Sequence, residues 1–281
     1  MEWVERLNQA ITYMEEHMTD EISYEELGRI TCCTSYHFQR MFTYMAGVPL
    51  SEYIRRRKMS LAAVDLKSGD KVIDVAFKYG YQSPTSFNRV FQSIHGVAPT
   101  VARDEATILK NYPPLLFQIQ IKGAAELNYR IVKKSSFRII GVSMALEKEV
   151  EKNFAIGPKM WEHALADGTI EKLASMMDSD IKGLLGVSVC NDDEQWKYYI
   201  AVASTYDIDE ELEEYTIPEA TWAIFSGQGK SRSIQELECR IITEWLPNSG
   251  YEYANIPDVE VYLNSDSENA CYEVWIPVLR K

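Results

Sequence analysis

Two short segments of the chain share one pattern of polar and aromatic side chains. Residues 34–42 and 83–91 each contain small polar residues followed by Phe-x-Arg-x-Phe. Small polar residues favour helix N-caps, so each segment predicts a helix that begins there. Arg40 and Arg89 then lie between aromatic side chains that face inward. An arginine on such a helix pairs with guanine in a DNA major groove, and the neighbouring Gln39 would pair with adenine.

Each of these helices must be positioned by the elements before it. Residues 24–30 and 72–79 form short apolar patterns of helical spacing directly upstream. A longer helix over 50–66 joins the two pairs, and another over 2–17 precedes them. The sequence therefore predicts two successive helix-turn-helix units with two recognition helices.

The first 105 or so residues resemble the DNA-binding module of the AraC/XylS family of bacterial transcription regulators. The resemblance is carried by both aromatic motifs and by residues 47–55, 73–76 and 96–99. It implies base or phosphate contacts from the start of each recognition helix: Ser35, Tyr36, Gln39 and Arg40 in the first, which we expect to face outward, and Thr85, Ser86, Asn88 and Arg89 in the second. Pro84 is unusual at its position, although the first turn of a helix tolerates proline. A solvated or ion-paired surface arginine is the alternative for Arg40 and Arg89.

The second half of the chain has the periodicity of strands. Residues 111–114 (Asn-Tyr-Pro-Pro) cannot continue a helix. We therefore expect a DNA-binding domain over 1–108, a linker over 109–124 and a second domain over 125–281. The second domain reads as strand-helix-strand-strand twice: 137–145, 154–166, 184–190 and 196–203, then 220–225, 234–246, 259–263 and 272–279. The predicted fold class is α+β, with an all-α domain followed by an antiparallel sheet backed by helices.

Residues 125–281 resemble the GyrI-like effector-binding domains that follow AraC-type and MerR-type DNA-binding modules. Residues 217–223, 257–263 and 272–278 carry this resemblance. It implies a pocket of aromatic side chains around a buried glutamate that binds drug-like, often cationic, molecules.

Strand alternation selects candidates for this pocket. Glu260 and Tyr262 share one face of their strand, and Glu273 and Trp275 share one face of theirs. A buried carboxylate among aromatic rings would attract an organic cation, whereas an exposed sheet face is the alternative for each glutamate. Further candidate walls are Trp222, Tyr198 and Tyr199.

The net charge of −13 is unevenly distributed. The first 110 residues carry 13 basic and 14 acidic side chains, and the remainder carry 16 and 28. A basic run over 55–58 would allow local DNA binding despite an acidic whole, and the acidic half favours a cationic ligand. A solvated acidic surface is the alternative for most of these charges.

Other features narrow the class of protein. The five cysteines are scattered and predict reduced thiols rather than disulfides or a metal site. No apolar run of 18 residues and no leader pattern occur, so we expect a cytoplasmic protein without cofactors. The expected partners are promoter DNA and a small cationic or amphipathic effector. RNA polymerase is a third candidate partner. A hydrolase using Glu260, Glu273 and Tyr262, or a drug-sequestering protein, is the alternative function.

Overall fold

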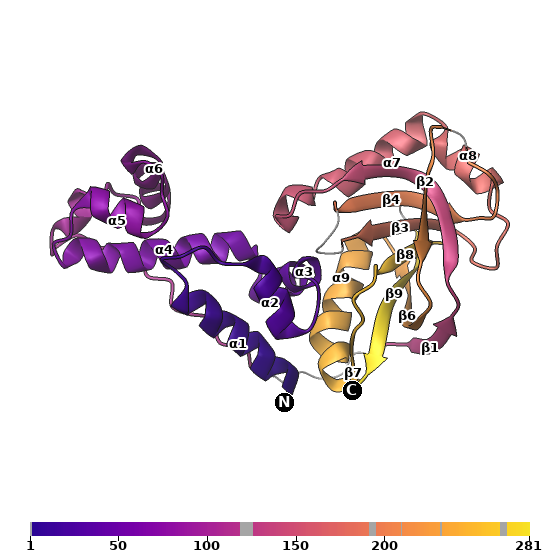
Figure 1. Ribbon diagram of the computed structural model, residues 1–281, viewed down its shortest axis with the longest axis horizontal. Helices are drawn as coiled ribbons and strands as arrows, with labels where there is room; N and C mark the ends of the chain where they lie inside the picture. The colour runs from indigo at the N-terminus through magenta and orange to yellow at the C-terminus, as the bar shows by residue number, and fades with distance from the viewer. Residues whose placement is uncertain (1, 119–125, 191–194, 209, 231, 265–268) are drawn as a thin grey trace. The chain divides into compact units, whose positions relative to one another are not determined.

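The computed structural model describes residues 2–118, 126–190, 195–208, 210–230, 232–264 and 269–281 (Figure 1). The chain divides into two compact units, residues 1–31 with 46–120 and residues 32–45 with 121–281. The expected boundaries at residues 108 and 124 stay a prediction, and the division groups the helix that contains Arg40 with the second unit. Each unit is described by itself below.

The first unit is helical. Its elements are α1 (Glu2–Glu16), α2 (Tyr24–Thr31), α4 (Leu50–Lys67), α5 (Val72–Lys78), α6 (Pro84–His95) and a 3₁₀ turn (Val101–Arg103). Helix α6 begins as the sequence predicts, because Ser83 Oγ accepts a hydrogen bond from the Ser86 amide and Pro84 occupies the first turn. Its aromatic residues Phe87 and Phe91 are buried against α4 and α5.

The basic run over residues 55–58 is largely occupied by internal partners. Arg57 is buried, and its Nη2 lies 2.6 Å from Glu15 Oε2. Arg55 and Arg56 both pair with Glu52 one turn earlier on α4. The run therefore offers less free positive charge than the sequence suggested.

Part of the expected linker packs on the first unit. The Tyr112 amide donates a hydrogen bond to Ser60 Oγ, and the Phe117 amide donates to Asn8 Oδ1 over 2.8 Å. Residues 119–124 lie outside the described residues. No helix in the described part of the chain is long and apolar enough to cross a bilayer.

The second unit contains α3 (Ser35–Ala46) and an antiparallel sheet with helices. Its strands are β1 (Tyr129–Lys134), β2 (Phe137–Ala145), β3 (Leu184–Val189), β4 (Lys197–Ala203), β5 (Glu213–Ile217), β6 (Ala220–Gly229), β7 (Tyr251–Tyr253), β8 (Val259–Tyr262) and β9 (Ala270–Arg280). Its other helices are α7 (Ile156–Ala166), α8 (Thr169–Ser175) and α9 (Arg232–Arg240), which continues as a π-helical turn over Ile241–Trp245, and 3₁₀ turns lie at Val150–Asn153 and Leu246–Asn248. The α+β fold class is confirmed, and β1, β5, β7 and α8 are additions to the predicted elements.

Each of the two strand-helix-strand-strand repeats is preceded by an additional strand, which pairs with the first strand of the other repeat. The sheet order is β1-β6-β9-β8-β3-β4-β2-β5, with β7 paired to β9. Strand β1 thus pairs with β6 of the second repeat, and β5 pairs with β2 of the first. Neither repeat is complete without the other.

The sheet has two differently covered faces. On the inner face, Phe137 of β2 and Trp275 of β9 have ring centroids 6.4 Å apart, although three strands separate them in the sheet. The sheet is therefore curled around an inner apolar core that includes Trp222 and Tyr199. Helices α7 and α8 cover the outer face at β4 (Figure 1), where Met160 and Leu173 pack on Ile200.

Candidate functional site

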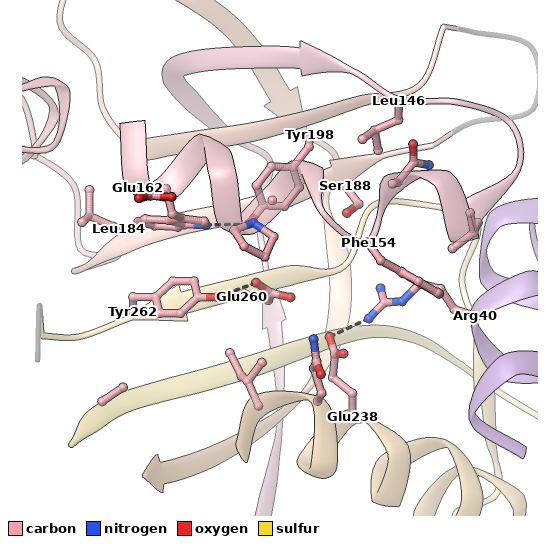
Figure 2. Close-up of a pocket in the computed structure, with 18 of the residues that line it drawn as sticks. Arg40, Leu146, Phe154, Glu162, Leu184, Ser188, Tyr198, Glu238, Glu260 and Tyr262 are labelled. Atoms are coloured by element: carbon pink, nitrogen blue, oxygen red, sulfur yellow. Dashed lines mark hydrogen bonds and ion pairs between the residues drawn. The ribbon is translucent and has the colours of Figure 1, made fainter. Parts of the chain in front are cut away.

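A cavity of about 720 Å³ opens on the outer face of the sheet within the second unit (Figure 2). Its walls come from α3, α7 and α9 and from strands β3, β4 and β8. Six aromatic side chains line it: Tyr36, Tyr44, Phe154, Trp161, Tyr198 and Tyr262. Three glutamates line it: the exposed Glu162 on α7, Glu238 on α9 and Glu260 on β8 (Figure 2).

Glu260 accepts a hydrogen bond from one aromatic side chain and lies near a second, hydrogen-bonded aromatic pair. Tyr262, two residues along the same strand, donates its hydroxyl to Glu260 Oε2 over 2.7 Å. The Trp161 indole donates to the Tyr198 hydroxyl over 2.9 Å. Gly186, the cross-strand neighbour of Glu260, makes room for both groups, since a Cβ there would lie 2.5 Å from the Tyr198 hydroxyl and 2.9 Å from Glu260 Oε2.

The cavity keeps Glu260 largely protonated at neutral pH. Burial, followed by the negative charge of Glu238, raises the pKa of Glu260 to about 8, while the Tyr262 hydrogen bond and the Arg40 charge oppose this. Burial also raises the pKa of Tyr198 and Tyr262 well above their usual range, so both hydroxyls remain donors. A positive charge in the cavity would favour ionisation of Glu260.

Glu238 is a second buried carboxylate, which the sequence reasoning missed. It is 3% exposed, and Tyr44 donates its hydroxyl to Oε2 over 2.7 Å. Its Oε1 lies 2.6 Å from Arg40 Nη2 as an ion pair. The sequence pattern could have predicted its burial. Glu238 follows Ile234 by four residues and precedes Ile241 by three, so it lies on the apolar face of the helix.

Asp258 completes the acidic group beside the cavity. Arg40 Nη1 donates to its Oδ2 over 2.7 Å, and His37 Nε2 lies 3.6 Å from its Oδ1. Burial alone would raise the pKa of Asp258, but the Arg40 charge, together with His37, holds it well below the usual range. Asp258 is therefore ionised and paired with Arg40.

The first recognition helix does not present its polar residues to solvent. Ser35, Tyr36 and Gln39 of α3 are buried, and the Arg40 side chain is 13% exposed. The Tyr36 hydroxyl donates to Ser188 Oγ of β3 over 3.0 Å. The prediction that these four residues face outward is wrong for this structure, because partners on the second unit occupy their polar atoms.

The second recognition helix, α6, presents its residues as predicted. Thr85, Ser86 and Arg89 are exposed, and Asn88 is half-buried. Their buried neighbours Phe87 and Phe91 fix the orientation of the helix. Contact of these residues with DNA stays a prediction.

The other pocket candidates lie on the inner face of the sheet. Register pairs Glu273 with Val261 and Trp275 with Val259, so both point away from Glu260. Glu273 instead accepts hydrogen bonds from the Trp275 indole and from Arg130 Nη2, each over 2.8 Å. Trp222 and Tyr199 belong to the inner core. The structure thus brings Glu260, Tyr262 and Tyr198 together and places Glu273, Trp275, Trp222 and Tyr199 outside this cavity.

The described residues contain no group of three or more histidine, cysteine, aspartate or glutamate side chains placed to hold a metal ion. The five cysteines have free thiols. The polar groups of the cavity include carboxylates, phenols and the Arg40 guanidinium.

Comparison with known proteins assigns both halves of the chain. A helix-turn-helix domain model matches residues 27–105, and a model described as an integron-associated effector binding protein matches residues 130–278, more than half of the chain. The transcriptional activator AarP of Providencia stuartii is 34% identical over 98 residues, which span 34% of this chain and 73% of AarP.

Two solved structures are each similar to about half of this chain. A bacterial transcription regulation protein from Staphylococcus aureus is 22% identical with a TM-score of 0.45, and the similarity covers 54% of this chain and 99% of that one. The structure of SAV2435 bound to tetraphenylphosphonium is 21% identical with a TM-score of 0.47, covering 54% of this chain and 94% of that one. The chain belongs to the AraC-type helix-turn-helix regulators that carry an integron-associated, GyrI-like effector-binding domain.

Proposed function

We propose that the effector of this regulator is a lipophilic organic cation, which binds in the cavity beside Glu260 and Glu238. The family establishes a DNA-binding transcription regulator with an effector-binding domain. The observation that carries the finer proposal is the presence of two carboxylates, the buried Glu238 and the half-buried Glu260, in one cavity of about 720 Å³ with aromatic walls. Ionisation of Glu260 without a matching positive charge is costly, so a cation that enters and allows Glu260 to ionise is favoured over a neutral molecule.

The rim of the cavity suits an amphipathic molecule. Phe154 and Leu165 line it and are each 55% exposed. A ligand with apolar groups would cover these side chains while its positive charge approached the carboxylates. The Tyr198 and Tyr262 rings supply further faces for cation–π contact.

Alternative functions are less well supported. The named relatives are transcription regulators, and this chain is a regulator rather than an enzyme. Sequestration of drugs alone would not require a helix-turn-helix module that is 34% identical to that of an activator. Contact with RNA polymerase and a cytoplasmic location would follow from the proposed role and stay predictions.

Calorimetric titration of the full chain tests the proposal. Tetraphenylphosphonium should bind at least about tenfold more tightly than triphenylphosphine oxide, a neutral molecule of similar shape, because only the cation pairs with the carboxylates. Glu260→Gln should lose most of this preference without unfolding, whereas Glu171→Gln, which neutralises an exposed carboxylate on α8, should keep it. Equal affinity for the two ligands would refute a cation site.

A further inference from the structure

Arg40 is a candidate both for DNA reading and for the effector cavity. The sequence marks it as a base-reading residue of the first recognition helix. In the structure it is the only basic side chain among the described residues that line the effector cavity. Its guanidinium bridges Glu238 and Asp258 at 2.6 Å and 2.7 Å (Figure 2 shows the Glu238 contact).

We propose that Glu238 and Asp258 form a binding site for the recognition helix α3, and that a cationic effector displaces Arg40 from this site and so releases α3 to bind DNA. This inference rests on the proposed function, because it requires a cation in the cavity. The recognition helix is then itself a ligand of the effector-binding domain, with Arg40 as a tethered counterpart of the effector.

Several specific hydrogen bonds hold α3 on the effector-binding domain. Gln39 uses both ends of its amide, since Nε2 donates to the Lys148 carbonyl over 2.9 Å and Oε1 accepts from the Val150 amide over 3.1 Å. Tyr36 and Tyr44 donate to Ser188 and Glu238. A glutamine that reads adenine needs the same donor and acceptor, so α3 cannot occupy this site and a major groove at once.

Packing reinforces these polar contacts. Tyr36 is buried against Val150, Cys190 and Trp196, and its ring meets Trp196 edge-on at 5.3 Å between centroids. The Arg40 guanidinium also lies 5.5 Å from the centroid of the Tyr36 ring. Apolar area, ring contacts and ion pairs therefore meet on one short helix.

Charge explains why an organic cation would be the releasing signal. Three carboxylates, Glu238, Asp258 and Glu260, surround a single guanidinium in the described site. Departure of Arg40 would leave Glu238 and Asp258 buried without that charge, and His37, 3.6 Å from Asp258, is the nearest other basic group that the structure pairs with them. An incoming cation removes this penalty, because it replaces the charge that leaves.

Glu260 provides a place for the cation to enter before Arg40 leaves. The negative charge of Glu238 contributes to raising the pKa of Glu260, so the two carboxyl groups interact electrostatically across the cavity. A cation held at Glu260 weakens the field that retains Arg40 and competes for Glu238. Coupling is reciprocal, so DNA that captures α3 must raise the affinity of the cavity for the cation by the same factor.

Titration of the natural chain and of two variants, Arg40→Gln and Arg29→Gln, with tetraphenylphosphonium tests the inference. Arg40→Gln removes the tethered competitor, so its affinity for the cation should rise by about tenfold or more relative to the natural chain, as expected when a competing state is removed. Arg29→Gln, which removes an exposed arginine paired with Glu26 on α2, is the matched control and should leave the affinity unchanged.

Amide hydrogen exchange supplies a second measurement on the natural chain. Saturating tetraphenylphosphonium should increase exchange across residues 35–46 at least severalfold, because α3 loses its partners, while exchange in α6 stays the same. Binding to the natural chain with no gain in Arg40→Gln and no change in α3 exchange would overturn the inference but leave the cation site intact. Absence of binding to both proteins would overturn the cation site and the inference together.

Discussion

At the scale of single residues, Glu260 combines two properties that an effector site requires. It is half-buried in a cavity with aromatic walls, and its carboxylate accepts a hydrogen bond from Tyr262. Burial raises its pKa to about 8, so below that pH the cavity mostly holds a neutral acid. Binding of a cation must then be coupled to loss of a proton.

The affinity for tetraphenylphosphonium should consequently depend on pH. Glu260 is protonated below about pH 8 and ionised above it, so affinity should rise from pH 6 to pH 8 by up to about tenfold per pH unit and then level off. Calorimetry in buffers of different ionisation enthalpy should show about one proton released at pH 6.5. A flat profile in the natural chain, or the same slope in Glu260→Gln, would show that Glu260 does not titrate with binding.

Gly186 is the residue whose lack of a side chain makes the site possible. A Cβ at this position would collide with the Tyr198 hydroxyl and Glu260 Oε2. Gly186→Ala should therefore lower cation affinity by about tenfold and the free energy of unfolding by about 1–3 kcal/mol. Calorimetry and urea denaturation measure the two effects. Gly157→Ala is the control for the unfolding measurement, since its Cβ would meet Tyr198 at an ordinary 3.9 Å, and equal losses of unfolding free energy for the two substitutions would contradict this account.

At the scale of elements, local patterns predicted most of the secondary structure. Strand β2 has the predicted bounds, and α7, β3, β4, β8 and β9 lie within two residues of theirs at each end. Alternation also placed Glu260 and Tyr262 on one face of β8. Strands β1 and β5 escaped prediction because each is an edge strand whose partner lies in the other repeat.

The site was harder to predict because it depends on register and on packing between elements. Alternation groups Glu273 with Trp275, but only the pairing of Glu273 with Val261 shows that this face is the inner one. The role of Glu238 could not be predicted without knowing that α9 lines the cavity. The helix α3 was predicted from its motif, yet the partners that bury Gln39 lie more than 100 residues away.

At the scale of the whole molecule, the recognition helices differ in their availability. Helix α6 exposes Arg89, whereas α3 is engaged by carboxylates of the second unit. The acidic charge of the second half thus has a local role beyond solubility, since part of it holds the arginine that the DNA would otherwise attract. Affinity for DNA should therefore be set by competition as well as by base contacts.

Selection from a pool of randomised duplexes at physiological salt tests this organisation. Two recognition helices in successive major grooves read blocks about 34 Å apart, so one chain should enrich an asymmetric site with two short conserved blocks. Tetraphenylphosphonium should increase the affinity of the natural chain for the selected duplex, because it frees α3. Failure to enrich any sequence, with only salt-sensitive weak binding, would argue against two specific readers.

Substitution of Arg40 and of Arg89 then distinguishes loss of DNA contacts from loss of the ion pairs that hold α3. Arg40→Ala and Arg89→Ala should each weaken binding to the selected duplex by about 1–3 kcal/mol in the presence of saturating cation, when both helices are free. Without the cation, the loss for Arg40→Ala should be smaller, since this substitution also removes the ion pairs that hold α3 away from DNA. Arg89→Ala has no such compensation and should show the same loss in both conditions. Gel-shift titrations at fixed salt distinguish these patterns, and a cation-independent loss for Arg40→Ala would show that Arg40 reads DNA without competing for the cavity.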